Sequence, residues 1–395
     1  MTKIIIVGAG QAGAGAALNL RELGFDGEIT LLGDEVHPPY ERPELSKGYV
    51  LGTTEFEKLV MLTPQKAQEL NIDMRLGWTV SRIDRDNKQI WSGAQMLPYD
   101  HLILATGGGA RRLPLPQAVQ SKTHVVRTRE DADALATALK TAKTVAVIGG
   151  GWLGLEAAAT CRQSGAEVHV FEAAPRLCAR VAPIWLSDHL AQLHRSHGVH
   201  LHLGHVPQIS DTGVFQTQEL QLTPDLVIVA IGMSAYDRLA VDAGLDCDDG
   251  VLVTANGLTS DPSIYAIGDC ARYPHLGNLR RESWQNANQS SLDAATAIIG
   301  GKPRATEPDW FWSNQFGQNI QMLGRCTDDF DQVLRVTGDA QSQFFFQNTV
   351  LKGVIAVNAP RDIGMSRGLI SKGNAMDMDK VRDPSVVLRK AVAAA

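Results

Sequence analysis

Residues 3–20, KIIIVGAGQAGAGAALNL, contain a short β-branched run, a glycine-rich turn and a run of small and apolar residues. The run at 4–7 predicts a buried strand, and residues 14–20 predict the start of a helix. Between them, residues 8–13 form the pattern G-x-G-x-x-G, whose glycines let the backbone turn tightly and approach a phosphate. The N-terminus of the following helix offers N–H groups to negative charge. This stretch therefore predicts a binding site for the pyrophosphate of a dinucleotide.

The context of this motif supports the interpretation. A glycine-rich helix start can also serve only to pack a helix closely against a strand, so the pattern alone is weak evidence. Here a second strand, predicted at 28–32, runs into Gly33, Asp34 and Glu35. A carboxylate at that point commonly binds the ribose hydroxyls of the dinucleotide.

The same unit recurs further along the chain. Residues 144–148 predict a strand, GGGWLG at 149–154 repeats the glycine pattern, and residues 155–164 predict a helix. The next strand, predicted at 168–171, ends at Glu172, roughly 20 residues after the turn, where a ribose-binding carboxylate is expected. Two copies of one unit make chance a poor explanation for either.

Glu172 also bears on the choice of coenzyme. An acidic side chain accepts hydrogen bonds from a free 2′-hydroxyl and repels a 2′-phosphate, so NADH is favoured over NADPH. Arg176 and Arg180 weaken this prediction, because a nearby arginine could receive the phosphate.

Composition sets the broad class. The 395 residues suit two or three domains, and 44% of them are hydrophobic, which is ample for sizeable cores. The formal net charge of −6 and the pI near 6.0 argue against nucleic acid or a membrane surface as the main partner. No apolar run reaches the length of a membrane-spanning helix. We expect a cytoplasmic protein.

Cysteine and histidine spacing predicts no metal site. The five cysteines are scattered and include no C-x-x-C pair, which excludes a sequence-local redox disulfide. The histidines lie mostly on a predicted helix and on the alternating strand GVHLHLGH at 198–205, and no carboxylate or cysteine completes a recognisable ligand spacing. The histidines concerned are His189, His194, His197, His200, His202 and His205.

The remaining segments complete an α/β pattern. Buried strands are predicted at 102–105 and 226–231, and a strand at 264–267 is followed directly by Gly268 and Asp269. From Trp310 onward, four alternating strands and a helix-rich tail predict a small α+β domain.

At this point the set of motifs resembles one family. It is the FAD-dependent, NADH-oxidising ferredoxin reductases that serve Rieske-type aromatic-ring dioxygenases and some bacterial cytochromes P450, which are similar in fold to glutathione reductase. The motifs are GAGQAG (8–13), YERPELSK (40–47), ATGG (105–108), VVRTREDA (125–132), GGGWLGLE (149–156), AIGDC (266–270), ESWQNANQ (282–289) and WFWSNQ (310–315).

The resemblance implies an α/β fold with two Rossmann-like dinucleotide-binding domains and a C-terminal α+β domain. The FAD-binding domain is expected to comprise residues 1–112 and 241–314, the NAD-binding domain residues 113–240, and the C-terminal domain residues 315–395.

The resemblance also implies the residues that contact the cofactors. Lys47 and Glu156 are expected to form an ion pair beside the flavin and to be the catalytic pair. FAD contacts are expected from Gly8, Gly10, Ala12, Gly13, Asp34, Arg42, Lys47, Val80, Thr106, Arg127, Asp269, Trp284 and Trp312. NAD contacts are expected from Gly149, Gly151, Leu153, Gly154, Glu156, Glu172, Arg180 and Gly232. The tryptophans could equally be core aromatics.

One departure from the glutathione-reductase fold defines the expected reaction. The loop that carries a redox cysteine pair in disulfide reductases is here residues 38–47, without cysteine. The resemblance therefore implies hydride transfer from NADH to FAD and then one-electron transfer to a separate [2Fe-2S] ferredoxin, of Rieske or plant type. An oxygenase would be reached only through that ferredoxin.

Two other functions fit the same residues. One is a flavin reductase acting on rubredoxin or a quinone, and the other is an NADH-sensing flavoprotein that signals by binding. Arginines at 111–112, at 280–281 and near Arg42 could form a docking patch for an acidic ferredoxin, although charged runs are more often plain solvated surface.

Overall fold

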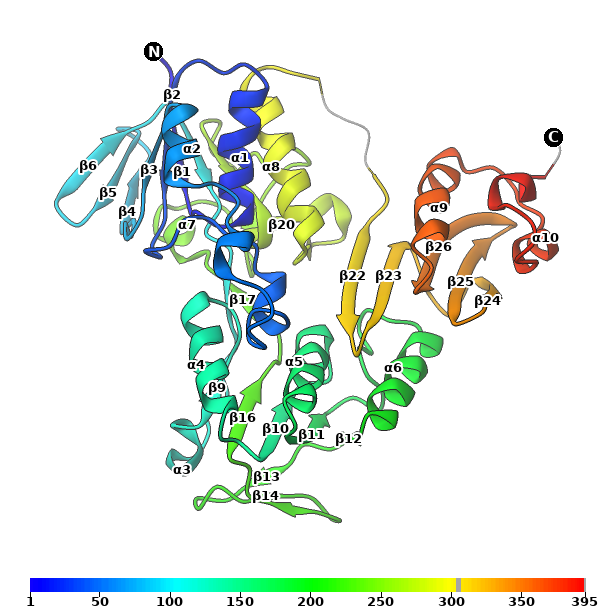
Figure 1. Ribbon diagram of the computed structural model, residues 1–395. Helices are drawn as coiled ribbons and strands as arrows, with labels where there is room; N and C mark the ends of the chain where they lie inside the picture. Colours follow the sequence, from blue (N-terminus) through cyan, green and yellow to red (C-terminus); the bar gives the residue numbers. More distant parts are fainter. Residues whose placement is uncertain (303–306, 394–395) are drawn as a thin grey trace. The chain divides into compact units, whose positions relative to one another are not determined.

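The computed structural model describes residues 1–302 and 307–393 and divides into two compact units (Figure 1). Unit 1 comprises Met1–Glu44, Thr54–Gly109 and Met233–Ala305. Unit 2 comprises Leu45–Thr53, Ala110–Gly232 and Thr306–Ala395. The division into three domains at the boundaries expected from the sequence stays a prediction.

Unit 1 is built on a parallel five-stranded sheet in the order β19-β7-β1-β2-β3. Its first βαβ unit is the predicted one, because the β-branched run at the start forms the central strand and the glycine turn leads into α1. The elements of this layer are β1 (Lys3–Val7), α1 (Gln11–Glu22), β2 (Glu28–Leu32), α2 (Pro64–Glu69), β3 (Ile72–Arg75), β7 (His101–Leu104), β19 (Ile264–Ala266) and α8 (Trp284–Ile298).

Helices α1 and α8 pack closely in unit 1. A Cβ on Gly15 would lie 2.8 Å from the Ser291 hydroxyl, and Asn19 donates a hydrogen bond to the same hydroxyl at 3.0 Å. The buried core beneath these helices includes Ile4, Ile6, Leu20, Leu31 and Ile103.

Smaller strands complete unit 1. They are the antiparallel β4 (Arg82–Asp84), β5 (Gln89–Ser92) and β6 (Gln95–Pro98), together with β8 (Gly108–Ala110), β17 (Met233–Ala235), β18 (Val251–Leu252), β20 (Ala271–Tyr273) and β21 (Leu279–Arg280), and they accompany α7 (Arg238–Asp242).

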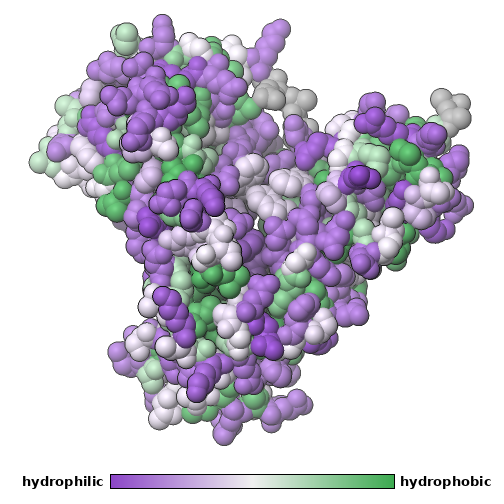
Figure 2. Space-filling view, viewed as in Figure 1, coloured by the Kyte–Doolittle hydropathy of each residue, from purple (hydrophilic) through white to green (hydrophobic). Residues whose placement is uncertain are grey.

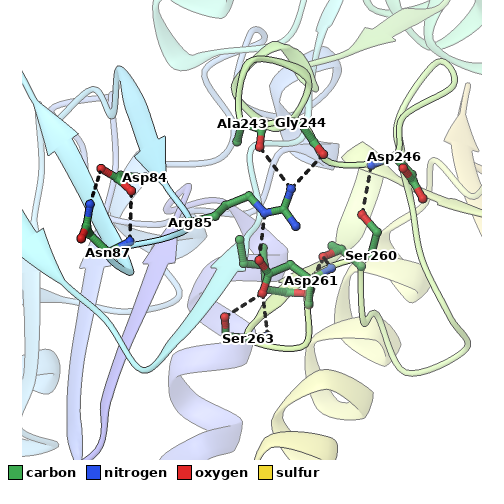
Figure 3. A network of polar contacts seen from close by, with 11 residues as sticks. Asp84, Arg85, Asn87, Ala243, Gly244, Asp246, Ser260, Asp261 and Ser263 are labelled. Atoms are coloured by element: carbon green, nitrogen blue, oxygen red, sulfur yellow. Dashed lines mark hydrogen bonds and ion pairs between the residues drawn. The ribbon is translucent and has the colours of Figure 1, made fainter.

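A polar network anchors the β4–β5 hairpin to the segment after α7 (Figure 3). Arg85 donates to Asp261 at 2.8 Å and to the Gly244 carbonyl at 2.9 Å, while Ser263 donates to Asp261 at 2.7 Å. Burial would raise the pKa of Asp261, but the hydrogen bonds from Arg85 and Ser263 outweigh it, and the pKa is lowered. A pocket of about 460 Å³ is lined by residues of this region, none of them a predicted site residue. We interpret the network as structural.

Unit 2 repeats the sheet of unit 1, with the parallel order β12-β11-β10-β16-β9. Its elements are α3 (Gln117–Gln120), β9 (Thr123–His124), α4 (Arg129–Leu139), β10 (Thr144–Ile148), α5 (Trp152–Gln163), β11 (Glu167–Glu172), α6 (Ile184–Ser196), β12 (Val199–Leu203), β13 (Gln208–Ile209), β14 (Phe215–Gln216), β15 (Gln221–Leu222) and β16 (Leu226–Val229).

The same unit carries the predicted α+β portion. An antiparallel sheet in the order β22-β23-β26-β25-β24 packs its buried Phe344, Leu351 and Val354 with residues of α9 and α10. The elements are β22 (Trp310–Gln315), β23 (Gln318–Gly324), β24 (Asp331–Thr337), β25 (Ala340–Gln347), β26 (Val350–Val357), α9 (Pro360–Lys372) and α10 (Met378–Arg382). The predicted fold class is therefore confirmed.

Several boundaries differ from the predicted ones. Helices α1 and α5 begin at Gln11 and Trp152, three residues earlier than predicted, because each starts inside its glycine turn. The loop at 38–47 contains a 3-10 helix, Pro43–Ser46.

The surface is mostly hydrophilic on the face that Figure 2 shows, with apolar residues in small separate groups. Among the described residues, no helix combines the length and the apolar character needed to cross a membrane.

Candidate functional site

The first glycine turn contains two glycines that packing requires and one that faces open space. Gly8 has φ +109°, and a Cβ there would lie 2.2 Å from the Ala105 carbonyl oxygen. A Cβ on Gly13 would lie 1.8 Å from the Gly8 carbonyl oxygen. At Gly10, by contrast, the nearest described atom is Nη2 of Arg42, at 4.0 Å. The middle glycine thus leaves a space in which a phosphate group fits.

The second turn has the same arrangement in unit 2. Gly149 has φ +113°, with a Cβ placed 2.3 Å from the Ala230 carbonyl oxygen, and a Cβ on Gly154 would lie 2.0 Å from the Gly149 carbonyl oxygen. No described atom lies within 4 Å of a Cβ on Gly151. Gly151 is also the N-cap of α5, and no described side chain caps that helix end. The N–H groups of the first helical turn therefore face an open cradle that suits a pyrophosphate.

Glu172 lies at the end of β11 beside this cradle. Its Oε2 accepts from the Gly150 backbone N–H at 2.6 Å, and its Oε1 accepts from the Ala174 N–H at 2.7 Å. Two backbone donors hold the carboxylate in a fixed orientation while its remaining lone pairs can accept from ribose hydroxyls.

Arg176 and Arg180, the two arginines that follow Glu172, differ in whether their side chains are free to contact a coenzyme. The guanidinium of Arg176 donates to the Ala182 and Ala179 carbonyls and to the Ser187 hydroxyl, so it holds the loop before α6. Arg180 is exposed, and its Nη2 lies 3.9 Å from the position of a Cβ on Gly232. Of the two, Arg180 is therefore the one placed near the predicted NAD residues.

Two carboxylates, Asp34 and Glu35, follow β2, and only Asp34 was expected to contact FAD. Asp34 is exposed and caps the Glu35 N–H at 3.1 Å. Glu35 forms an ion pair with Arg42 and accepts from the Tyr40 hydroxyl at 2.6 Å. The sequence placed Glu35 beside Asp34 but did not predict its pairing with Arg42, which holds that guanidinium beside the open space at Gly10.

Asp269 and Ala12 come together in unit 1. Gly268 and Asp269 form a short 3-10 turn after β19, and a Cβ on Gly268 would lie 2.8 Å from that of Ala12. Burial would lower the pKa of Arg42, but the charges of Tyr40, Glu35 and Asp269 outweigh burial and raise it. The predicted residues Gly10, Ala12, Arg42 and Asp269 thus share one region.

Three other predicted FAD residues lie in unit 1 with clear local roles. Thr106 donates its hydroxyl to the Tyr236 carbonyl at 2.7 Å, at the end of β7. Trp284 opens α8 and donates Nε1–H to Glu41 at 3.3 Å. Val80 is partly buried against the second core cluster of the unit.

Lys47 and Glu156 form the expected ion pair, whereas its place beside the flavin and its catalytic role stay predictions. Their charged atoms are 2.9 Å apart, and their side chains are only 12% and 9% exposed. Glu156 also accepts from the hydroxyl of Ser46 at 2.8 Å and from that of Ser313 at 2.6 Å. Both carboxylate oxygens are therefore supplied with donors although Glu156 is buried.

A chain of hydrogen bonds continues from Glu156 into the core of unit 2. Gln315 donates to the Ser313 hydroxyl at 2.9 Å, and its amide oxygen lies 2.7 Å from Nε2 of His194. His194 is fully buried, and burial lowers its pKa to about 4, so the ring is neutral and Nε2–H is the donor. We call Ser313, Gln315 and His194 the Glu156 chain, because each member donates toward that carboxylate.

The remaining predicted residues of unit 2 lie near helix starts and aromatic stacks. The Trp312 ring stacks on Trp310 with 4.9 Å between centroids, and Trp152 packs on Phe311 at 4.7 Å. Arg127 precedes α4 and donates its backbone N–H to Asp131 at 3.0 Å. Leu153 lies in the first turn of α5. Flavin contact by Trp312 stays a prediction.

The predicted site residues divide between the two units. Unit 1 contains Gly8, Gly10, Ala12, Gly13, Asp34, Arg42, Val80, Thr106, Asp269 and Trp284, whereas unit 2 contains Lys47, Arg127, Trp312 and all of the predicted NAD residues.

The proposed docking patch is wrong at Arg280. This side chain is 7% exposed and is paired with Asp249 at 3.3 Å and Glu282 at 2.8 Å. Arg42 is likewise paired with Glu35. Arg111 and Arg112 are exposed in unit 2.

The prediction that no metal site is present stays a prediction, but the fold brings together a group that sequence spacing did not reveal. Among the described residues, Glu167, His169 and His200 place one potential ligand atom each within 4.8 Å of the others. The sequence separation of β11 and β12 concealed this grouping.

Comparison with known proteins agrees with this geometry. The chain matches the model of the pyridine nucleotide-disulphide oxidoreductase family over residues 2–291 and that of the reductase C-terminal family over residues 310–392. It is 38% identical to the ferredoxin–NAD(+) reductase component of the 3-phenylpropionate/cinnamic acid dioxygenase of Photorhabdus laumondii, over 93% of this chain and 95% of that one.

Two solved structures have the same fold throughout. The chain superimposes with a TM-score of 0.91 and 33% identity on the reductase in the covalent putidaredoxin reductase–putidaredoxin complex, covering 99% of this chain and 98% of that one. It matches the ferredoxin reductase for the CYP199A2 system from Rhodopseudomonas palustris with the same TM-score of 0.91, 33% identity and 100% of both chains. The chain therefore belongs to the pyridine nucleotide-disulphide oxidoreductase family, within its group of ferredoxin reductases.

Proposed function

We propose that this protein is an FAD-containing oxidoreductase that passes electrons from NADH to a [2Fe-2S] ferredoxin, which in turn feeds a Rieske aromatic-ring dioxygenase or a cytochrome P450. The observation that carries the proposal is the presence of two open glycine cradles in one chain, at Gly10 and Gly151. One cradle suits a resident dinucleotide and the other a dinucleotide that binds and leaves.

Unit 1 holds most of the residues that would bind FAD, and Lys47, Arg127 and Trp312 belong to unit 2. The cradle at Gly10 would receive its pyrophosphate, Arg42 would supply positive charge there, and Asp269 would accept a hydrogen bond from a ribityl or ribose hydroxyl. Bound FAD supplies the ability to accept two electrons together and to release them one at a time.

Unit 2 holds the residues that would bind NADH. The cradle at Gly151 would receive the pyrophosphate, and Glu172, fixed by two backbone N–H groups, would accept from the adenosine ribose. Arg180 would lie near the coenzyme beside Gly232.

The buried ion pair of Lys47 and Glu156 holds the Lys47 ammonium group in a fixed position. Glu156 accepts hydrogen bonds from the hydroxyls of Ser46 and Ser313 and lies 2.9 Å from the Lys47 nitrogen. We propose that this ammonium group stabilises the negative charge that develops on the reduced flavin.

The loop at 38–47 bears on the electron acceptor. All five cysteines are free, and none lies in this loop. We infer that electrons leave the flavin directly for an external acceptor, and the relatives named as ferredoxin reductases support a ferredoxin in that role. Free thiols and the use of NADH favour a cytoplasmic location.

Acceptor specificity tests this proposal. The FAD-loaded protein is supplied with NADH and with a [2Fe-2S] ferredoxin, a rubredoxin or a soluble quinone in turn. We expect kcat/KM to be highest for the ferredoxin by at least an order of magnitude. A higher value for rubredoxin or quinone would reassign the acceptor, and rapid reduction by NADH with no turnover on any acceptor would assign an NADH sensor instead.

A further inference from the structure

Two neighbouring strands of unit 2 bring histidines to the same face of the sheet. Strand β12 is the edge strand and pairs in parallel with β11, so that His169 is in register with His200. Side chains alternate along a strand, so Glu167 lies on the same face as His169, and His202 on the same face as His200. One face of this sheet edge thus carries three imidazoles and one carboxylate.

The potential ligand atoms are already close together. Oε1 of Glu167 lies 3.1 Å from Nε2 of His169 and 3.8 Å from Nε2 of His200. In a tetrahedral zinc site with bonds of 2.0–2.1 Å, ligand atoms are separated by about 3.3 Å. Movements well below the length of a side chain would therefore place all three atoms around one ion.

His169 is held in place by a second histidine. Its side chain is 5% exposed, its Nδ1 lies 3.1 Å from Nε2 of His202, and its ring stacks on those of His200 and His202. When Nδ1 donates its proton to His202, the lone pair of Nε2 faces Glu167. This is the arrangement by which an outer hydrogen bond orients a metal-binding imidazole.

The other two groups provide access from solvent. The side chains of His200 and Glu167 are 55% and 56% exposed. An ion can therefore reach the site without any opening of the sheet, and exposed side chains can turn to complete the coordination.

We propose that Glu167, His169 and His200 bind one transition-metal ion of the zinc class, with His202 orienting His169 and water in the fourth position. Two imidazoles with one carboxylate suit Zn²⁺, Ni²⁺ or Cu²⁺ rather than Mg²⁺ or Ca²⁺, which prefer oxygen ligands alone. The ion links the edge strand β12 to β11 and so stabilises unit 2, because it binds only the folded arrangement. This site is separate from the residues assigned to FAD and NADH, so it stands independently of the proposed function.

Zinc titration tests the site directly. Untagged, FAD-loaded protein is treated with a chelator, dialysed and titrated with ZnCl2 by isothermal titration calorimetry. We expect one ion per chain, and we expect Glu167→Gln and His200→Gln each to weaken binding at least tenfold. His205→Gln is the matched control, because His205 is an exposed histidine just beyond β12 and outside the group.

A spectroscopic measurement identifies the ligands independently of folding stability. With Cu²⁺ as the probe, electron paramagnetic resonance of the oxidised protein is expected to show coupling to two nitrogen nuclei, and to one in His200→Gln. Unchanged zinc affinity in His200→Gln and Glu167→Gln, equal loss in His205→Gln, or the absence of stoichiometric binding would each overturn the proposal.

Discussion

Single residues in the two glycine turns and around Glu156 determine how the proposed site is built. A side chain on either outer glycine of each turn would collide with a backbone carbonyl oxygen. A side chain on Gly10 or Gly151 would extend into open space. The surroundings of Glu156 are instead closely packed, since this buried carboxylate is stabilised by three side-chain donors. A buried charge is stable only while such partners remain.

Removing the charge of Glu156 is expected to destabilise unit 2. Glu156→Gln leaves Lys47 buried without its counter-charge, which costs roughly 3–5 kcal/mol. Ser313→Ala removes the hydrogen bond to the Glu156 carboxylate and the one accepted from Gln315, and costs about 1–3 kcal/mol. Urea unfolding of the FAD-loaded protein measures both values. Ser196→Ala is the control, because that hydroxyl donates to the Leu193 carbonyl of its own helix and otherwise lies 3.3 Å from Nδ1 of the adjacent His197. Equal stability of all three variants would contradict a stabilising role for the donors to Glu156.

The Glu156 chain predicts a pH dependence of stability. Burial lowers the pKa of His194 from 6.5 to about 4, so the unfolded chain binds a proton more readily than the folded one. The stabilisation is complete above pH 6.5 and is lost as the pH falls toward 4, by roughly 3 kcal/mol in all. We expect His194→Gln to show a shallower loss of unfolding free energy over this window than the wild type. A variant with exposed His205 replaced by Gln should keep the full slope, and an unchanged slope in His194→Gln would contradict the account.

We expect coenzyme choice to depend on Glu172 and Arg180. Replacing Glu172 by Ser removes the repulsion of a 2′-phosphate and leaves Arg180 to receive it. We expect the ratio of kcat/KM for NADH to that for NADPH to fall at least tenfold, and to recover partly in Glu172→Ser combined with Arg180→Gln. Steady-state kinetics with both coenzymes measure this ratio. A preference for NADH that survives Glu172→Ser would show that other residues set the specificity.

At the scale of elements, the order and type of strands and helices were predictable and their contacts were not. The β-branched runs, the glycine turns and the carboxylate after β11 are local signals with fixed spacing, so both βαβ units could be predicted from the sequence. The helix starts came three residues too late because glycines were assigned to the turn alone.

The contacts that the sequence did not predict were missed for one physical reason. Glu35 was visible beside Asp34, but its pairing with Arg42 depends on how the loop at 38–47 folds back. His194 and Gln315 lie on different elements, and Glu167 and His200 lie on neighbouring strands far apart in sequence. Only tertiary structure brings such groups together, because no spacing rule connects them.

The start of α5 offers a matched pair of substitutions. Gly154→Ala places a methyl group 2.0 Å from the Gly149 carbonyl oxygen, so the helix must move and the protein is expected to lose stability. Gly151→Ala meets no described atom within 4 Å, so stability should be kept while the methyl group occupies the cradle and weakens NADH binding at least tenfold. Thermal unfolding and NADH titration separate the two effects. Loss of stability in Gly151→Ala with normal NADH affinity would show that the space at Gly151 does not bind the pyrophosphate of NADH.

For the whole molecule, two copies of one nucleotide-binding unit are joined to a C-terminal sheet domain. The family models cover residues 2–291 and 310–392, in agreement with the resemblance on which the function was predicted. The fold alone does not select the ferredoxin partner, because partner choice depends on surface chemistry.

The exposed arginines of unit 2 test the docking of an acidic partner. Replacing Arg111 and Arg112 by Glu reverses two positive charges on the surface, which slows the association of an acidic ferredoxin. We expect ferredoxin reduction to slow about tenfold at low salt and the difference to shrink at high salt. Reduction of the protein by NADH serves as the internal control and should not change. An unaltered salt dependence of ferredoxin reduction would remove these arginines from the interface.

The most direct test of the central claim is an anaerobic stopped-flow experiment with the purified, FAD-loaded protein. NADH is mixed in first and an excess of oxidised [2Fe-2S] ferredoxin second, while the absorbance of the flavin and of the ferredoxin is followed. The account predicts rapid loss of the flavin absorbance with NADH, much slower loss with NADPH, and recovery of the flavin as two ferredoxin molecules are reduced per NADH. A protein that binds no FAD, or one that is reduced by NADH but leaves the ferredoxin oxidised, would contradict it.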